Sequence, residues 1–360
     1  MNKFMQILGI CILLVVFLSY ITPYINNYFY SSYSSFGIKI INPQISYLKI
    51  EKVLINLPFK FIIENNCSFK DSEIKLIQIV TSYAGNVEAR SALRRAYPTN
   101  DLKKLGIYRI FLLSVLKSSD ITQNALINEN ERFNDIIQGD FIESYKNLTY
   151  KHLMGLNWVV NYCKNINYII KMDDDIIVDL YKLLRLIQET KNFQMLGYIF
   201  NNMRPIRIKA NKWYVSTKEY DKNTYPSFLS GWLYVVNVKT AQTLIELSLK
   251  TPFFWIDDVY VTGILTDKAN IKFEDMSKYF TTNPEYLECC IRDKIDCDII
   301  VGPSGGDNNL QIFFQKHAFK CFNSICDRYI NGKFLNNSCI TQRKTTPLHK
   351  GFPNLHIIKL

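Results

Sequence analysis

The feature that most constrains the fold is a short apolar stretch that runs into three acids, Asp173, Asp174 and Asp175. The isoleucine-rich residues Tyr168–Met172 are typical of a buried strand, and a second apolar run, Ile176–Val178, follows the acids. Burying three carboxylates between two core segments is costly unless a positive charge accompanies them. On an extended chain Asp173 and Asp175 point to the same side, which suits oxygen ligation of Mg²⁺ or Mn²⁺. An acidic loop tip that faces water is the alternative interpretation.

Strand-like and helix-like stretches alternate on both sides of these acids. The pattern predicts strands over residues 74–81, 109–116 and 195–200, and helices over residues 87–97, 145–162 and 181–189. Such alternation predicts an α/β fold with a mostly parallel sheet flanked by helices. Ligands of such sheets bind beyond the carboxyl ends of the strands, so the position of the acids suits a metal-bound nucleotide.

The N-terminal region predicts a membrane anchor. Residues 4–21 are almost continuously apolar, which is long enough to span a bilayer. Lys3 precedes this run and no charged residue follows it until Lys39, so we expect the N-terminus in the cytosol. No small-x-small motif ends the run, which favours an uncleaved anchor over a cleaved signal peptide. The predicted organisation is a cytoplasmic tail, a transmembrane signal anchor, a stem, a lumenal domain and a C-terminal tail, over residues 1–3, 4–22, 23–72, 73–330 and 331–360.

The cysteines point to an oxidising compartment. Of the nine cysteines, Cys11 lies in the apolar N-terminal run and six of the others cluster between Cys289 and Cys339. An even cluster of this kind predicts disulfides, although their pairing cannot be deduced from the sequence. A zinc site is the alternative, but no paired C-x-x-C spacing occurs and the chain has four histidines.

Composition and charge narrow the class of protein further. The apolar content of 48% supports a substantial core and argues against global disorder. The net charge of +11 is scattered without a long basic run, so we expect no nucleic-acid partner.

Five ordered blocks between about residues 77 and 326 carry a family resemblance. The blocks are Ala89–Tyr97, Asp135–Lys151, Lys171–Asp175, Tyr225–Tyr234 and Ile256–Gly263. They are similar to the patterns A-R-x-x-I-R-x-T-W, D-I-I-x-x-D-F-x-D-S-Y-x-N-L-T-x-K, D-x-D, Y-P-x-Y-x-S-G-x-G-Y and E-D-V-x-x-G. In this order the blocks resemble glycosyltransferase family 31, the β-1,3-galactosyltransferases and β-1,3-N-acetylglucosaminyltransferases.

The chain also departs from the family patterns. Tyr97 stands in place of Trp, Glu143 in place of Asp, and Asp257 in place of Glu. The least conservative change is Trp232–Leu233, which replaces a small residue and a glycine. Because glycine allows a ligand to approach the backbone closely, these two side chains are expected to reshape the sugar pocket.

The resemblance implies a GT-A-type fold and inverting transfer from a UDP-sugar. The expected donor is UDP-galactose or UDP-N-acetylglucosamine, and the acceptor is a sugar hydroxyl of a glycoprotein or glycolipid glycan, joined in β-1,3 linkage. It also implies a single-pass type II protein of the Golgi membrane with a lumenal catalytic domain. The alternative is a catalytically silent relative that acts as a lectin-like partner or chaperone of another transferase.

The resemblance also assigns a metal site. Asp173 and Asp175 are expected to hold Mn²⁺ or Mg²⁺ on the diphosphate, where the ion offsets the charge of the leaving group. His317 lies where some relatives carry a histidine that reaches the metal, although a lone histidine is more often structural. Asp174 is expected to contact the ribose or the donor sugar.

Further roles follow from the other blocks. Asp258 is the expected general base on the acceptor hydroxyl; the alternative is that Asp257 or Asp258 caps the following helix. Arg90 and Arg94, one helical turn apart, are expected to meet the diphosphate or to order the loop after the first strand, the alternative being a solvated basic face. The remaining expected residues of the nucleotide pocket are Asp140, Tyr145 and Lys151.

Overall fold

The computed structural model describes residues 59–67, 75–117, 120–323 and 326. All of them belong to one structural unit, residues 52–360. The predicted anchor at 4–22 and the predicted tail at 331–360 lie outside the described residues. No helix within the described ranges is both long and apolar enough to cross a bilayer.

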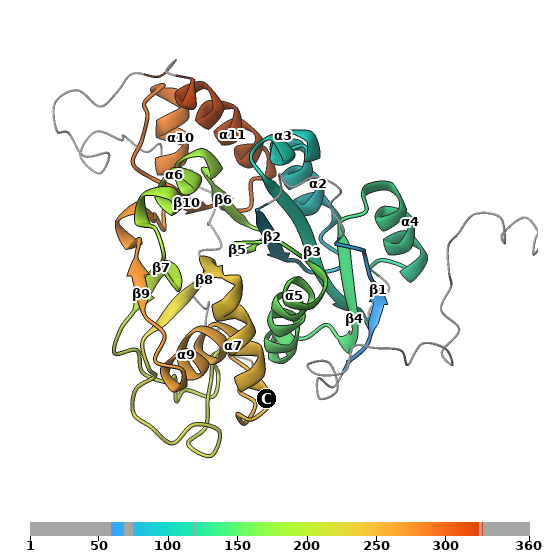
Figure 1. Cartoon of the computed structure of the whole chain (residues 1–360), viewed down its shortest axis with the longest axis vertical. Coiled ribbons are helices and arrows are strands. Elements are labelled where there is room, and N and C mark those ends of the chain that lie inside the picture. Colours follow the sequence, from blue (N-terminus) through green and yellow to red (C-terminus); the bar gives the residue numbers. More distant parts are fainter. Residues whose placement is uncertain (1–58, 68–74, 118–119, 324–325, 327–360) are drawn as a thin grey trace, which may run out of the picture. The chain divides into compact units, whose positions relative to one another are not determined.

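An eight-stranded sheet forms the centre of this unit, with the strand order β1-β4-β3-β2-β5-β8-β7-β9 (Figure 1). Its parallel half contains β2 (Leu76–Thr81), β3 (Ile107–Val115), β4 (Ile136–Ile142) and β5 (Tyr168–Asp173). The other half contains β8 (Phe228–Asn237), antiparallel to both β5 and β7 (Met195–Phe200), and β9 (Phe273–Asp275), parallel to β7. At the opposite edge, β1 (Phe61–Ile63) runs antiparallel to β4. A separate small sheet pairs β6 (Ile176–Val178) with β10 (Val301–Pro303).

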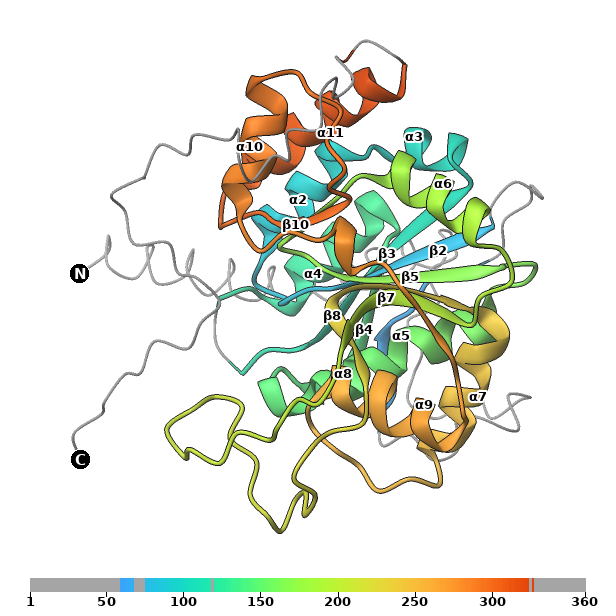
Figure 2. The same ribbon diagram turned by 90° about the vertical axis from the view of Figure 1, so that its left-hand side faces the viewer.

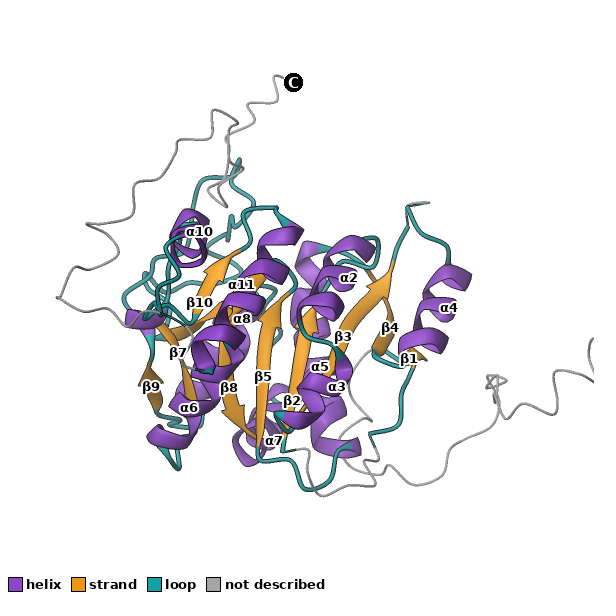
Figure 3. Cartoon of the chain, turned by 90° about the horizontal axis from the view of Figure 1, so that it is seen from above, coloured by secondary structure: helices purple, strands orange, loops and turns teal. Residues whose placement is uncertain are grey.

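Helices cover both faces of the sheet, as Figure 2 shows from the side. One layer contains α2 (Val87–Ala96), α3 (Thr99–Lys104), α6 (Leu180–Thr190), α10 (Pro284–Arg292) and α11 (Asn308–Phe322). The other contains α5 (Leu148–Tyr162), α7 (Val238–Ser248), α8 (Asp257–Val259) and α9 (Leu265–Lys268). A further helix, α4 (Gln123–Phe133), precedes β4, and Figure 3 shows it beside the β4–β1 edge.

The core explains why the parallel strands are mostly apolar on both faces. In β2, Ile77 and Ile79 pack into the core on the α5 side, while Leu76 and Val80 pack into the core on the α2 and α6 side. Strands buried on both faces carry near-continuous apolar runs rather than an alternation. The predicted α/β sheet flanked by helices is therefore confirmed.

The structure differs from the prediction at several elements, and two of them are α4 and β1. The polar stretch that precedes β4 is helix α4, which the sequence pattern did not indicate because it buries only Leu126. The segment before residue 73, expected to be stem, already contributes β1 and the buried Cys67 to the domain.

Cys67 forms a disulfide with Cys163 at the end of α5, 96 residues away. Two further disulfides, Cys290–Cys297 and Cys321–Cys326, close short loops in the C-terminal part. The prediction of disulfides is confirmed, and the first of them ties the β1 segment to the domain.

Candidate active site

The three acids lie where β5 ends, at the carboxyl edge of the parallel strands. Thr81, the last residue of β2, is in register with Asp173. Asp174 donates its N–H to the Thr81 carbonyl at 3.1 Å. The Asp174 Oδ2 atom accepts hydrogen bonds from Ser82 Oγ at 2.7 Å and from Asn86 Nδ2 at 3.0 Å. Asp174 therefore fixes the loop after β2, and its expected contact with the ribose or the donor sugar stays a prediction.

A buried lysine connects the acids to a second part of the site. Lys171 lies two residues before Asp173 on β5, so both side chains point to the same face. Its Nζ atom is 2.7 Å from Asp173 Oδ1 and donates to the Gly231 carbonyl at 2.5 Å. A Cβ atom built on Gly231 would lie 3.6 Å from Lys171 Nζ and 3.7 Å from Asp258 Oδ2. Lys171 thus links Asp173 to the surroundings of Asp258, a role that no sequence signal indicated.

The adjacent acids Asp257 and Asp258 begin α8 and face different partners. Asp257 Oδ2 lies 3.0 Å from Nδ1 of His152. Asp258 Oδ1 accepts the following backbone N–H at 2.7 Å, while its Oδ2 has no hydrogen-bond partner among the described residues and faces Gly231. The residue that precedes the helix is Ile256, and no side chain caps it, so neither aspartate is the N-cap.

Burial dominates the electrostatics of the acid block. Desolvation, with repulsion from Asp175, raises the pKa of Asp173 to about 7 although Lys171 opposes the shift. Desolvation likewise raises the pKa of Asp174 to about 6, against the hydrogen bonds that its carboxylate accepts. The pKa of Asp175 is also raised, because neighbouring protein atoms partly desolvate its carboxyl group although the residue as a whole is exposed. A raised carboxyl pKa means that the fold leaves the negative charge undercompensated.

The pKa values of the adjacent acids Asp257 and Asp258 shift in opposite directions. Desolvation and the charge of Asp257 raise the pKa of Asp258 to about 7. Burial alone would raise the pKa of Asp257 too, but the hydrogen bond to His152 and the charge of Lys171 lower it to about 2. Two neighbouring carboxyl groups with separated pKa values are typical of groups that carry different roles.

The acid block fits a hard divalent cation. Asp173 and Asp175 offer carboxylate oxygens, and Asp175 is exposed and forms no ion pair with a described residue. No third acidic, histidine or cysteine side chain of the described ranges converges on these two. Ions such as Mg²⁺ are commonly held by one or two carboxylates together with substrate phosphates, which is the donor set available here.

His317 does not join this group. It lies on α11, where its Nε2 atom contacts the Ile295 carbonyl at 2.8 Å. Cys321 and Cys326 lie beside it, but their sulfur atoms form a disulfide and therefore offer no thiolate for a metal. The structure thus gives His317 a packing role on α11 and brings it near neither Asp173 nor Asp175.

A cluster of aromatic and basic side chains lies near the acids of the site. Tyr145 accepts a hydrogen bond from the indole N–H of Trp213, and its ring lies 6.1 Å from that of Trp255. Lys212 Nζ sits 5.1 Å from the Tyr145 ring centre and 4.2 Å from that of Trp213. Burial and the charges of the nearby acids, Asp257, Asp258 and Asp173, raise the Tyr145 pKa. Of the three residues expected in the nucleotide pocket, Tyr145 is the one that reaches these acids.

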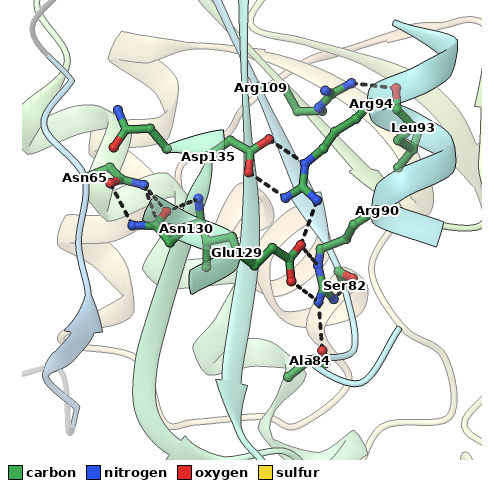
Figure 4. A network of polar contacts seen from close by, with 12 residues as sticks. Asn65, Ser82, Ala84, Arg90, Leu93, Arg94, Arg109, Glu129, Asn130 and Asp135 are labelled. Carbon is green, nitrogen blue, oxygen red and sulfur yellow. Dashed lines mark hydrogen bonds and ion pairs between the residues drawn. The ribbon is translucent and has the colours of Figure 1, made fainter. Parts of the chain in front are cut away.

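Arg90 serves the loop after β2 rather than a ligand (Figure 4). Its side chain is fully buried, and its guanidinium donates to Glu129, Ser82 Oγ and the carbonyls of Tyr83 and Ala84. These contacts use all five guanidinium N–H groups, so none remains for a diphosphate. The expected ordering of the loop is the contact seen, and the diphosphate contact is not.

Arg94, one turn further along α2, belongs to the same network. It pairs with Glu129 at 2.7 Å and with Asp135 at 2.7 Å, and its guanidinium lies 4.0 Å from the Phe133 ring centre. Its side chain is 9% exposed, which excludes a solvated basic face. Figure 4 shows Asp135, Glu129 and both arginines as one connected group between α2 and α4.

Lys151 lies close to Asp174, whereas Asp140 lies away from the acids. Lys151 is buried on α5, where its ammonium contacts Glu143 at 2.7 Å and donates to the Ser82 carbonyl at 2.8 Å. Asp140 is exposed at the β4–β1 edge and accepts the backbone N–H of Lys60 at 2.7 Å. Lys151 therefore stabilises the loop after β2 through the Ser82 carbonyl, and Asp140 stabilises the segment next to the edge strand β1.

The two residues expected to reshape the sugar pocket lie mainly in the core. Leu233 is fully buried and in register with Met172, and Trp232 packs against the same apolar cluster. The neighbouring residue that borders Asp258 is Gly231, which the family pattern retains. The departure at Trp232 and Leu233 therefore changes the packing on the α6 side of β8.

Residues 88–277 of the chain match the family described as Galactosyltransferase. The chain belongs to the galactosyltransferase family. Its curated relatives include human β-1,3-galactosyltransferase 2, which is 35% identical over 219 residues that cover 59% of this chain and 52% of the relative. Mouse β-1,3-galactosyltransferase 1 is 36% identical over 221 residues, covering 59% of this chain and 66% of the relative. The chain thus spans about half to two thirds of the length of the curated relatives that it matches.

Solved structures of other glycosyltransferases are more distantly similar to this family member. The galactosyltransferase LgtC in complex with donor and acceptor sugar analogs shares 10% identity at a TM-score of 0.33, covering 68% of this chain and 95% of that one. A Drosophila β-1,4-galactosyltransferase 7 mutant in complex with manganese, UDP-Gal and xylobiose shares 11% identity at a TM-score of 0.29, covering 56% of this chain and 65% of that one.

Proposed function

We propose that this protein is an inverting hexosyltransferase that moves galactose or N-acetylglucosamine from a UDP-sugar to a sugar hydroxyl in β-1,3 linkage. Family membership and the named relatives support the reaction class and the linkage. The observation that carries the proposal is Asp258, whose Oδ2 is unpartnered among the described residues, lies beside the acid block and belongs to a carboxyl group with a pKa of about 7. The acceptor is a glycan of a glycoprotein or a glycolipid.

The donor side of the site is the acid block. Asp173 and Asp175 would hold Mn²⁺ or Mg²⁺, and the bound ion offsets the negative charge of the departing diphosphate. Lys212 adds a second positive charge close to Asp175, as their opposed effects on each other's pKa indicate. Asp174 and Lys151 hold the loop after β2 in place beside the donor.

The acceptor side is the unpartnered oxygen of Asp258. The Oδ2 atom of Asp258 takes the proton of the acceptor hydroxyl while the oxygen of this hydroxyl attacks the anomeric carbon of the donor sugar. The bond between the anomeric carbon and the diphosphate breaks, and its electron pair leaves with UDP. A general base is most efficient when its pKa lies near the working pH, which the burial of Asp258 provides. One displacement of this kind inverts the anomeric configuration.

Aromatic rings next to Asp258 suit the acceptor sugar. Tyr145 is 44% exposed, and Trp213 is partly exposed beside it, so their rings offer an apolar surface to the C–H faces of a pyranose. The buried hydroxyl of Tyr225 has no hydrogen-bond partner within the described ranges and lies close enough to Asp258 to be affected by its charge. A sugar hydroxyl is a suitable partner for it.

The test is a donor panel on the purified full-length chain with Mn²⁺. UDP-galactose, UDP-N-acetylglucosamine and UDP-glucose are each supplied with galactose-, N-acetylglucosamine- and N-acetylgalactosamine-terminated glycans. We expect transfer from one of the first two donors, a β-1,3 linkage in the product, and loss of transfer on chelation or in Asp175→Asn. A protein that binds UDP and Mn²⁺ but transfers no sugar would be the catalytically silent relative, and transfer in excess chelator would contradict the metal role.

We also propose that the chain is a single-pass type II protein of the Golgi membrane with its catalytic domain in the lumen. The apolar residues 4–21 and the disulfides of the domain support this location. Protease treatment of sealed Golgi vesicles should leave the domain intact until detergent is added. Digestion without detergent would contradict the proposed topology.

A further inference from the structure

A buried chain of three polar side chains lies directly behind the proposed base. His152 on α5 contacts Asp257 with one ring nitrogen, Nδ1, at 3.0 Å, and Tyr234 Oη on β8 with the other, Nε2, at 2.5 Å. His152 is 1% exposed and Tyr234 is fully buried. The three residues come from three elements, and Asp257 is the immediate neighbour of Asp258.

The hydrogen-bond donors and acceptors among Asp257, His152 and Tyr234 can be assigned from the chemistry of their side chains. Burial lowers the pKa of His152 despite the opposing effect of Asp257, so the ring is neutral with one N–H and one acceptor nitrogen. Burial and the charge of Asp257 raise the pKa of Tyr234, which therefore keeps its hydroxyl hydrogen. A carboxylate can only accept, so Nδ1–H donates to Asp257 and the Tyr234 hydroxyl donates to Nε2.

The arrangement removes one of two competing carboxylates from the reaction. Asp257 Oδ2 is held by His152 on the α5 side, whereas Asp258 Oδ2 faces Gly231 and has no hydrogen-bond partner among the described residues. The held carboxylate also stays negatively charged, and its charge acts on Asp258. His152 is the side chain that holds the Asp257 carboxylate by a hydrogen bond, and together with the charge of Lys171 it keeps this carboxyl ionised.

We propose that His152 is a positioning residue for the base: it holds the Asp257 carboxylate away from the acceptor, so that Asp258 alone presents an oxygen there. This inference rests on the proposed transferase function. The side chain of Asp257 is one methylene shorter than the glutamate of the family pattern, and His152 Nδ1 lies 3.0 Å from its carboxylate.

Two matched substitutions distinguish the contact of Nδ1 with Asp257 from the contact of Nε2 with Tyr234. His152→Asn keeps an amide N–H near the position of Nδ1 and so keeps the donor to Asp257. His152→Gln places its amide near the position of Nε2, which keeps a partner for Tyr234 but leaves Asp257 without a donor. Each is measured in the full-length chain for kcat, for acceptor KM and for UDP affinity in the presence of Mn²⁺, the last serving as the test of folding.

We expect His152→Gln to lower kcat by about 10–100-fold, the loss typical of removing the partner that orients a functional group, with UDP affinity unchanged. His152→Asn should recover most of this loss, and Tyr234→Phe should lose less than His152→Gln. Because His152 acts through Asp257, the double variant His152→Gln/Asp257→Asn should lose no more kcat than the more impaired single variant.

Equal kcat in wild type and His152→Gln would overturn the inference, and so would fully additive losses in the double variant. Loss of UDP binding in both His152→Asn and His152→Gln would also overturn it, since the histidine would then be a core residue without a separate effect on the base. If the wild-type chain transfers no sugar from any donor, the proposed function fails first, and the two failures are therefore distinguishable.

Discussion

The molecule contains two buried groups of charged side chains, and they are built in opposite ways. In the α2–α4 network, Glu129 and Asp135 are matched by Arg90 and Arg94 with several hydrogen bonds each. In the cluster at the end of β5, the acids outnumber the cations, and Lys171 is the buried ammonium that several of them share.

The pKa shifts record this difference. Burial would raise the pKa of Glu129, but Arg90 and Arg94 outweigh it and lower the pKa. At the end of β5, burial wins and raises the pKa of Asp173 and Asp258 to about 7. A matched ionic group stabilises a fold, whereas an undercompensated one is poised for a cation or a proton, so the comparison separates architecture from function.

The largest expected effect is on the rate of sugar transfer and concerns Asp258, in the acidic cluster at the end of β5. Asp258→Asn should lower kcat by about 10²–10⁴-fold because it removes the general base. UDP affinity in the presence of Mn²⁺, measured by calorimetry, should stay near the wild-type value, since the contacts of Asp258 are not with the acid block. Transfer at a near wild-type rate would move the base to another residue, and a lost UDP affinity would assign Asp258 to the donor site.

The next effect is on stability and concerns the matched group. Glu129→Gln removes the ionic partner of the buried Arg90 and one of the two partners of Arg94, and it should lower the free energy of unfolding by about 3–5 kcal/mol. The control is Lys104→Gln, which breaks the exposed Lys104–Asp101 pair and should cost less than about 1 kcal/mol. Denaturant unfolding of the purified chain measures both changes in the free energy of unfolding. Equal changes would contradict the stabilising role of the α2–α4 network.

The two groups should also give stability opposite dependences on pH. Glu129 has a lowered pKa in the folded state, so its contribution is present above its ordinary value of 4.5 and is lost as the pH falls through the folded value. Asp258 has a raised pKa, so its contribution is present below its ordinary value of 3.8 and is lost as the pH rises to about 7. Unfolding free energies measured between pH 3 and 8 with chelator should show the second decline in the wild type and a flatter curve in Asp258→Asn. An unchanged curve would contradict the burial of this charge.

The smallest expected effect concerns the aromatic surface beside the second group. Trp213→Ala should raise acceptor KM by roughly 10-fold, since loss of one stacked ring costs about 1 kcal/mol or slightly more, while donor KM and Tm change little. Trp213→Phe, which retains a ring, should recover most of the acceptor affinity. A rise in donor KM instead would assign this surface to the nucleotide.

Local sequence patterns predicted a substantial part of the fold. The strand at Met195–Phe200 has the predicted bounds, and α2 and α6 begin and end within one residue of their predictions. Helix α4 and strand β1 were missed because each buries few apolar side chains and leaves a weak periodic signal. Strands β4 and β8 were also not predicted, and the antiparallel pairing of β8 could not be, because a strand pattern says nothing of the direction in which it pairs.

The sequence by itself determined the position of the acids on the chain and the alternation of elements that places them at the carboxyl edge of a sheet. Both follow from neighbours in sequence, through strand period and apolar runs. The tertiary structure alone decided what each charged side chain does. Arg90 forms an ion pair with Glu129, 39 residues away, and Asp257 is held by His152, 105 residues away. The availability and pKa of a buried charged group depend on burial and on partners from other elements, and these are fixed only when distant segments pack together.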